Sequence, residues 1–238
     1  NGSTICEIQV EAKDFSVIHF DIARKYIYFS IHKTIFNHSL FRNRINSFQF
    51  LDFSKEYPLL KPIKQVAEFR SYPNDIHFVG VYKEFVLVRV PAGLVWLRPE
   101  NDDFPNTKPP KLPKDDLSNR CTPAIRGDLF YYLRNSIEQI PLLNTEQLSI
   151  FSLTKQKVVA SLDVSPYGSK FTSLKIVAID PFKNFVILRS NAHSRGLTSF
   201  IAVDPKFKSI TSTYDCYLSS QVSDLVASGK DLFCTFVD

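Results

Sequence analysis

Short runs of apolar and aromatic residues alternate with polar turns along the chain, and this pattern predicts strands throughout. The stretch Ile176–Asp204 shows it best, with a short apolar run at Ile176–Ile179, a continuous one at Phe185–Leu188 and an alternating one at Leu197–Val203. Runs of about four to eight β-branched and aromatic residues bounded by Pro, Asn, Asp and Gly are typical of β-strands. Helical spacing does not fit these residues. The protein is therefore predicted to be all-β.

The same unit of apolar strand, polar turn and apolar strand recurs along the chain. Its second strand begins in turn at Tyr26, Phe85, Leu129, Phe185 and Leu232, so the spacings are 59, 44, 56 and 47 residues. Periods of about 40–50 residues with four strands each are typical of propeller blades, whose insertions fall in loops. One small four-stranded sheet cannot bury both of its faces, whereas radially stacked sheets can. The predicted fold class is all-β, a β-propeller of four-stranded antiparallel blades that is incomplete or open.

Five units are predicted, and the last is a half unit. A lone strand, Thr4–Val10, precedes them, and Val66–Arg70 is predicted as an outer or linker strand after an interruption by Pro58 and Pro62. The strands of the units are predicted at Val17–Phe20, Tyr26–Ile31, Thr34–Phe41, Ser47–Phe53, Ile76–Val81, Phe85–Val90, Leu94–Leu97, Pro123–Arg126, Leu129–Leu133, Gln147–Leu153, Val158–Val164, Ile176–Ile179, Phe185–Leu188, Leu197–Val203, Ser209–Tyr214, Val222–Ala227 and Asp231–Val237.

Residues 1–238 are predicted to form a single propeller domain with about 4.5 visible blades. Residues 98–120 interrupt the pattern with a stretch rich in Pro, Lys, Asp and Asn. Such a composition buries too little apolar surface to offset the entropy of ordering it. We therefore expect an exposed or partly disordered excursion, which is either a plain connection or a partner-binding insertion.

The blade number leaves two explanations open. Closed propellers usually need more blades than these, so either part of the parent chain is missing or the ring is open and a partner supplies strands. An open sheet edge can pair with a strand from another chain. The chain lacks methionine and begins with Asn1, from which we expect a cut or processed piece of something longer.

The hairpin plan, for example IVAIDPFKNFVILRS followed by LTSFIAVD and SITSTYD, resembles that of the WD40-like propellers. The resemblance covers most of the chain and implies blade-like sheets. The Gly-His and Trp-Asp dipeptides of WD40 repeats are missing, and the one tryptophan, Trp96, is followed by Leu97. The likeness is therefore to the blade plan and not to one sequence family.

Composition indicates a globular protein, since 44% of the residues are hydrophobic and 13% aromatic. The net charge of +5 is mild, and Lys and Arg are interspersed with Asp and Glu without the basic run that marks a dedicated nucleic-acid binder. No apolar run approaches about 18 residues, so we predict no transmembrane segment.

The cysteines bear on the cellular compartment. Cys6, Cys121, Cys216 and Cys234 form no CxxC pair and have no histidines at metal-ligand spacing. They are interpreted as buried free thiols in a reducing compartment, cytoplasmic or nuclear, with disulfides as the alternative. Sequons at Asn1 and Asn37 keep a secreted or lumenal location open.

Motifs of catalysis are missing from the sequence. It contains no G-x-S-x-G, H-E-x-x-H, P-loop or G-x-G-x-x-G. The five histidines are spread along the chain without a pair at the spacing that ligands share on a strand or helix. We therefore expect a protein that is not an enzyme and that holds no metal or cofactor, although propeller hydrolases show that the fold itself does not exclude catalysis.

Basic residues recur at the end of the second predicted strand. If the blades are related by rotation, these residues reach one face of the disc, where a ring of guanidinium groups suits a carboxylate or phosphate on a partner. The alternative is that each arginine caps its own strand and pairs with a local acid. The candidate binding residues are His32, Lys33, Arg89, Arg134, Arg189, His193 and Arg195.

Three functions are compatible with these observations. The first is a non-catalytic propeller that acts as a protein–protein interaction scaffold in a larger complex, through its loop face or an open blade edge. The second is binding of nucleic acid or anionic lipid headgroups through a basic loop face, which salt would weaken steeply. The third is a secreted receptor or enzyme domain.

Overall fold

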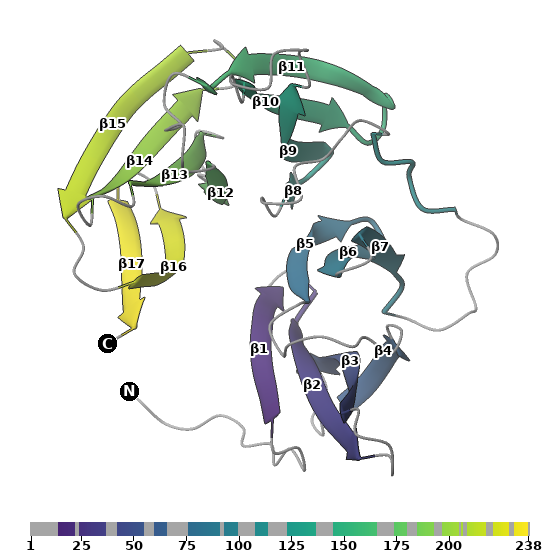
Figure 1. Ribbon diagram of the computed structural model, residues 1–238. Helices are drawn as coiled ribbons and strands as arrows, with labels where there is room; N and C mark the ends of the chain where they lie inside the picture. The colour runs from purple at the N-terminus through teal and green to yellow at the C-terminus, as the bar shows by residue number, and fades with distance from the viewer. Residues whose placement is uncertain are drawn as a thin grey trace. The chain divides into compact units, whose positions relative to one another are not determined.

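The computed structural model describes residues 14–21, 24–36, 42–54, 60–65, 76–90, 93–99, 108–113, 123–136, 145–165, 174–179, 185–192, 197–204, 206, 209–217, 221–228 and 231–237. The regular elements within these ranges are β-strands, which confirms the all-β prediction (Figure 1). Among the residues so described, no helix is long and apolar enough to cross a membrane.

Strands of the described residues follow one another at short intervals along the chain. Their bounds are β1 Asp14–Asp21, β2 Tyr26–Phe36, β3 Arg42–Asp52, β4 Leu60–Gln65, β5 His77–Tyr82, β6 Phe85–Val90, β7 Gly93–Leu97, β8 Ala124–Arg126, β9 Leu129–Ser136, β10 Thr145–Ser152, β11 Lys157–Asp163, β12 Lys175–Ile179, β13 Val186–Ala192, β14 Leu197–Asp204, β15 Ser209–Tyr217, β16 Gln221–Ser228 and β17 Asp231–Val237.

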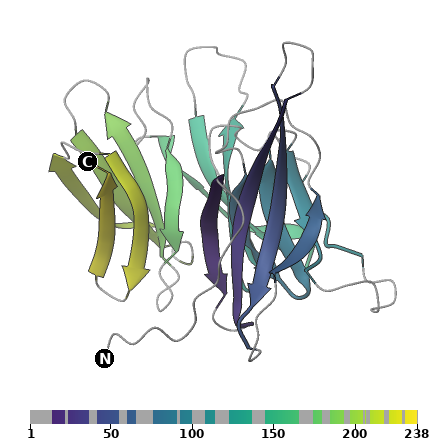
Figure 2. The same cartoon turned by 90° about the horizontal axis from the view of Figure 1, so that it is seen from below.

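These strands form small antiparallel sheets, none of which is closed. Three of the sheets have four strands in the orders β1-β2-β3-β4, β8-β9-β10-β11 and β12-β13-β14-β15, while β5-β6-β7 and β16-β17 form smaller ones. Strands consecutive in the chain lie side by side in each sheet (Figures 1 and 2). The predicted four-stranded antiparallel unit is thus confirmed for the third and fourth units. The first unit also has four strands, but with other bounds, because the two strands predicted at Tyr26–Ile31 and Thr34–Phe41 are one strand, β2.

The chain divides into two compact units, which are described separately. Unit 1 holds Asn1–Phe78 and Lys83–Thr107, and unit 2 holds Val79–Tyr82 and Lys108–Asp238. The end of β5 therefore belongs to unit 2, together with β8 to β17. That one propeller domain spans the whole chain stays a prediction.

The second strands begin where the sequence predicted. Tyr26, Phe85 and Leu129 are the first residues of β2, β6 and β9, Phe185 directly precedes β13, and Leu232 is the second residue of β17. The tight turns before three of these strands hold a residue at positive φ, namely Lys25 (58°), Lys83 (51°) and Gly127 (55°). Such a residue reverses the chain tightly enough for the next strand to pair at once.

The same backbone hydrogen bond supports two of these turns. The amide of Phe53 donates to the carbonyl of Lys25 at 3.0 Å, and the amide of Leu153 donates to the carbonyl of Asp128 at 2.9 Å. In both sheets the residue that follows the third strand is thereby tied to the residue that precedes the second. The two sheets share this detail of backbone structure although their sequences differ at these positions.

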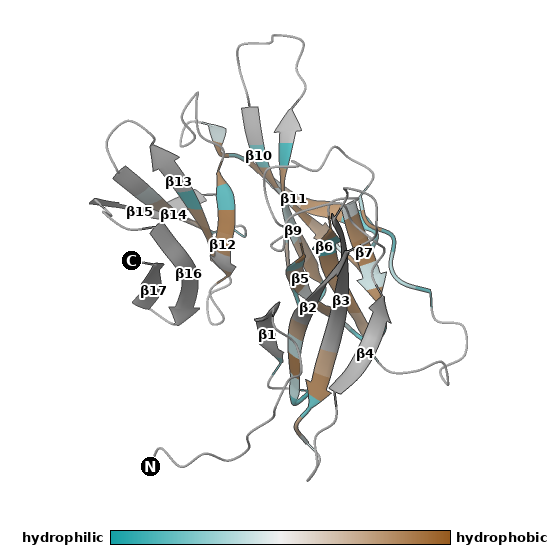
Figure 3. Cartoon of the chain, turned by 60° about the horizontal axis from the view of Figure 1, so that its bottom comes forward, coloured by the Kyte–Doolittle hydropathy of each residue, from teal (hydrophilic) through white to brown (hydrophobic). Residues whose placement is uncertain are grey.

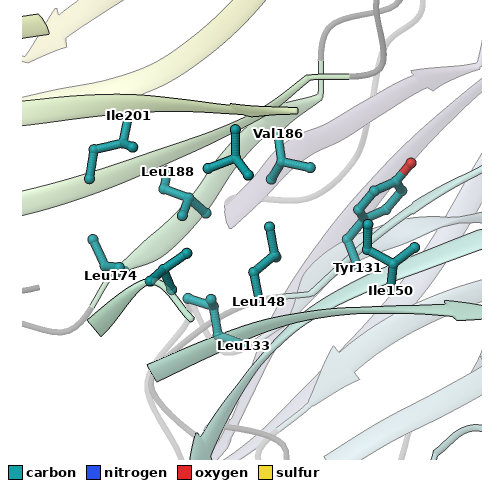
Figure 4. Close-up of a cluster of buried hydrophobic side chains, with 10 residues drawn as sticks. Tyr131, Leu133, Leu148, Ile150, Leu174, Val186, Leu188 and Ile201 are labelled. Atoms are coloured by element: carbon teal, nitrogen blue, oxygen red, sulfur yellow. The ribbon is translucent and has the colours of Figure 1, made fainter. Parts of the chain in front are cut away.

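The core of unit 2 lies between the sheet of β8–β11 and the sheet of β12–β15. Register pairs place Tyr131 with Ile150 and Leu133 with Leu148 on one face of the first sheet. Figure 4 shows these side chains pointing toward others from the second sheet, and the buried cluster consists of Tyr131, Leu133, Leu148, Ile150, Val164, Leu174, Val186, Leu188, Ile201 and Val203. Burying each large apolar side chain contributes roughly 1.5–3 kcal/mol, so this face-to-face contact is a main source of the unit's stability.

The opposite face of the β8–β11 sheet is buried as well. Phe130 and Tyr132 lie on it, and their rings stack with centroids 5.4 Å apart. Because both faces of β9 are covered, its residues Leu129–Leu133 are all apolar or aromatic, as expected for an inner strand. The coloured part of β12 changes from hydrophilic to hydrophobic along the strand, in line with its sequence KIVAI (Figure 3).

Two predicted boundaries in the first unit are wrong. His32 and Lys33 were predicted in a loop, whereas β2 continues through both to Phe36 because β3 pairs with it along its whole length. The predicted interruption at Pro62 is also wrong, because β4 runs through this residue from Leu60 to Gln65. Proline lacks an amide hydrogen but is tolerated on an edge strand, and β4 is at the edge of its sheet, where the register shifts beside Pro62.

Other predictions concern residues outside the described ranges, among them the strands Thr4–Val10 and Val66–Arg70. In the excursion, residues 98–99 and 108–113 are described and belong to no strand. Lys108, Pro109 and Lys111 are exposed, whereas Pro99 is buried and the remaining described residues are half-buried, so the predicted exposure is not found along the whole of this part.

Candidate functional site

The candidate basic residues fall on the second strands of their sheets, as far as the structure describes them. On β2, His32 is paired with Asn46 and Lys33 with Ile45. His193 and Arg195 lie outside the described residues. The arginines are paired with neighbouring strands as follows: Arg89 with Leu94, Arg134 with Gln147, and Arg189 with Phe200 and Lys175.

The three arginines do not occupy one equivalent position. Arg89 is one residue from the last pair of its hairpin, which involves Val90, whereas Arg134 is two residues from the pair at Ser136. Arg189 is three residues from the pair at Ala192. Side chains alternate between faces along a strand, so a step of one residue moves a side chain to the other face. Their occurrence on second strands therefore does not give the arginines a common position or direction.

Two of the arginines, Arg134 and Arg189, belong to unit 2. They lie on opposite outer faces of its two stacked sheets. Arg134 shares a face of β9 with Tyr132, and Arg189 shares a face of β13 with Ile187, by the alternation of side chains. Each of these faces is the one directed away from the buried cluster. Arg134 is exposed and Arg189 is half-buried. Of the two, Arg134 is better placed to meet a partner.

Arg126, which the sequence analysis did not single out, links two first strands. It ends β8, and its Nη1 donates to the backbone carbonyl of Ile179, the last residue of β12, at 3.3 Å. The bond joins neighbouring sheets at the same end of their first strands. In the sequence, the position of Arg126 directly before the Gly127-Asp128 turn was the only feature that indicated a structural role.

Asp128 is the centre of a polar network at the turns of the β8–β11 sheet. Its Oδ2 accepts from Ser152 Oγ at 2.6 Å, and its Oδ1 accepts from the Thr154 amide at 2.7 Å and from Thr154 Oγ1. The Lys155 amide donates to Ser152 Oγ at 3.0 Å. Tyr82, at the end of β5, lies with its hydroxyl 3.0 Å from Thr154 Oγ1.

This network sets the ionisation of Asp128. Burial acts to raise the pKa of its carboxyl, but hydrogen bonds from Ser152 and Thr154 and the charge of Lys155 outweigh burial and lower the pKa below its usual value. A carboxylate held ionised by hydrogen bonds from two other residues ties turns together, and it is unsuited to proton transfer near neutral pH. The role of Asp128 is therefore structural.

Unit 1 carries an aromatic and cationic stack on β6 and β7. The rings of Phe85 and Trp96 meet edge to face with centroids 6.1 Å apart, and Arg98 lies over the Phe85 ring at 5.1 Å. Trp96 is half-buried, and among the described residues its Nε1 has no hydrogen-bond partner. The stack fixes the chain where it leaves β7 toward the excursion.

No group of three or more His, Cys, Asp or Glu side chains that could hold a metal ion occurs within the described ranges. A comparison of the chain with protein-family profiles gives no match, and neither does a comparison with curated protein sequences.

Proposed function

We propose that the chain is a β-propeller scaffold that binds protein partners inside a larger complex and carries no catalytic site of its own. The observation that supports this most is the position of β12. This first strand of its sheet contacts β8 and β9 of the preceding sheet and β16 of the following one. First strands that neighbour one another in chain order are what a propeller places around its axis.

The packing of unit 2 supports the same proposal. One face of the β8–β11 sheet covers one face of the β12–β15 sheet, so consecutive four-stranded meanders bury each other. Arg126 adds a polar link between the first strands at one end. Repeats that bury their faces against neighbours form rigid arrays, and such arrays present their loops as an extended binding surface.

Arg134 is the residue we expect to contact a partner at the loop face. It is exposed near the far end of β9, two residues before the last pair of the β9–β10 hairpin. A guanidinium group at this place suits an acidic side chain of a protein partner, because its planar fork binds a carboxylate through two parallel hydrogen bonds.

The test is capture of partners from source cells by the tagged chain at roughly 50 mM and 500 mM salt. We expect a stoichiometric protein partner at both salt concentrations, and about tenfold weaker capture by Arg134→Glu. Lys157→Glu is the matched control, since it makes the same charge change on an exposed residue at the opposite end of the same sheet. Its capture should equal that of the wild type.

Two results would contradict the proposal. Capture of nucleic acid or anionic lipid that falls with a steep power of salt concentration would favour the basic-surface alternative. Equal capture by Arg134→Glu and the wild type would remove the loop face as the binding surface.

A further inference from the structure

The described part of the excursion, Lys108–Pro113, has the sequence KPPKLP and belongs to neither helix nor strand. We propose that this segment is a polyproline II ligand that docks into the aromatic-lined groove of an SH3-type domain on a partner protein. The surface is separate from the loop face proposed above, and the inference does not depend on the propeller.

The residue types restrict the backbone of this segment strongly. The rings of Pro109, Pro110 and Pro113 hold φ near −65°, and a following proline biases Lys108 and Leu112 away from the helical region. Both effects favour the polyproline II conformation. None of the residues is at positive φ. We therefore expect the segment to be close to the bound conformation of a proline-rich ligand before it meets a partner, which would lower the entropic cost of binding.

A polyproline II helix has three residues per turn, so residues three apart share an edge. One edge then holds Pro110 and Pro113, and a second holds Pro109 and Leu112. Two consecutive pairs of an apolar residue followed by proline, Pro109-Pro110 and Leu112-Pro113, match the P-x-x-P pattern that aromatic grooves bind. The third edge holds Lys108 and Lys111.

Exposure indicates how a partner would approach. Lys108, Pro109 and Lys111 are exposed, while Pro110, Leu112 and Pro113 are half-buried. Binding must therefore expose these half-buried residues further, which costs free energy. We expect a dissociation constant in the micromolar range. Two exposed lysines on one edge favour a groove with acidic residues at its rim.

The experiment measures binding of the whole purified chain to a panel of recombinant SH3 domains by fluorescence anisotropy. At least one domain with an acidic rim should bind with micromolar affinity. Pro110→Ala should weaken that binding at least tenfold, because it removes one of the two prolines, Pro110 and Pro113, that share an edge of the helix. The matched control Val158→Ala also removes two carbon atoms from an apolar side chain, but it lies on β11, outside the segment, and should leave the binding unchanged.

Thermal unfolding of Pro110→Ala should match the wild type, since the segment contributes no strand to either unit. A melt that shifts for Pro110→Ala alone would attribute its loss of binding to folding and overturn the inference. The absence of binding by every domain of the panel at millimolar concentration, or equal losses for the two variants, would overturn it as well.

Discussion

Gly80 of β5 and Ile125 of β8 approach so closely that a Cβ on residue 80 would lie 2.5 Å from the Cβ of Ile125 and 3.0 Å from its carbonyl oxygen. Ile125 shares its face of the β8–β11 sheet with Phe130, so a strand of the preceding sheet meets the second buried face of this one. Only glycine allows the contact. Because residue 80 has no side chain, β5 and β8 can pack closely against each other within unit 2.

We predict that Gly80→Ala lowers the free energy of unfolding by about 1–3 kcal/mol, because an added methyl group in a packed contact forces strain or a shift of backbone. Urea denaturation measures the change. In an Ile125→Gly background the same substitution should cost less, since the nearest atom is gone. Equal costs in both backgrounds would show that the contact with Ile125 is not the cause.

Gly127→Ala separates a conformational cost from a steric one. Gly127 is at a φ of 55°, and a Cβ there would meet nothing within 4 Å. We predict a loss of about 1 kcal/mol, due to the left-handed backbone alone. Gly127→Asn should cost less, since asparagine tolerates this region better than alanine. Thermal unfolding of the three proteins tests the order, and a neutral alanine variant would contradict the turn geometry.

Asp128→Ala should destabilise the protein by about 2 kcal/mol, because Ser152 and Thr154 lose a charged acceptor. Asp163 provides the control, since this exposed residue accepts hydrogen bonds only from Ser165 among the interactions described for it. Asp163→Ala should cost less than about 1 kcal/mol. Similar costs for the two would show that the network around Asp128 adds nothing to a local turn.

The pH dependence of stability follows from the same network. The pKa of Asp128 is lowered in the folded protein, so its contribution to stability is complete above the pKa of the unfolded chain. The contribution is lost as the pH falls through the lower pKa of the folded protein. The difference in unfolding free energy between wild type and Asp128→Asn should therefore shrink on acidification. A difference that grows toward acid pH would have the wrong sign for a lowered pKa.

The strands could be predicted from the sequence because their determinants are local. Alternation and two-residue turns such as Gly127-Asp128 fix where β6, β9 and β17 begin within a residue. The end of β2 could not be predicted in this way. His32 and Lys33 are polar, and they remain in the strand only because β3 pairs with them. Likewise, Pro62 fits β4 because of its place at a sheet edge, which depends on the whole sheet.

The candidate site was less accessible to sequence reasoning. That an arginine follows the apolar run of the second strand could be predicted, but the prediction that it closes the strand is wrong for two of them. The strands β9 and β13 continue past Arg134 and Arg189 to Ser136 and Ala192, because the neighbouring strands pair with them there. Within unit 2, Arg134 and Arg189 both lie on faces directed away from the buried cluster, which follows from the packing of the two sheets and not from the local sequence. The Asp128 network joins residues 24 and 26 positions apart, and nothing in the pattern around Ser152 and Thr154 indicates such a partner.

The proposed loop face exists only if the sheets share an axis. A crystal structure of the chain would show whether they do. We expect β1, β5, β8, β12 and β16 to line one axis as the innermost strands of consecutive radial sheets. A two-layer sandwich, or first strands that lie apart from one another, would contradict it.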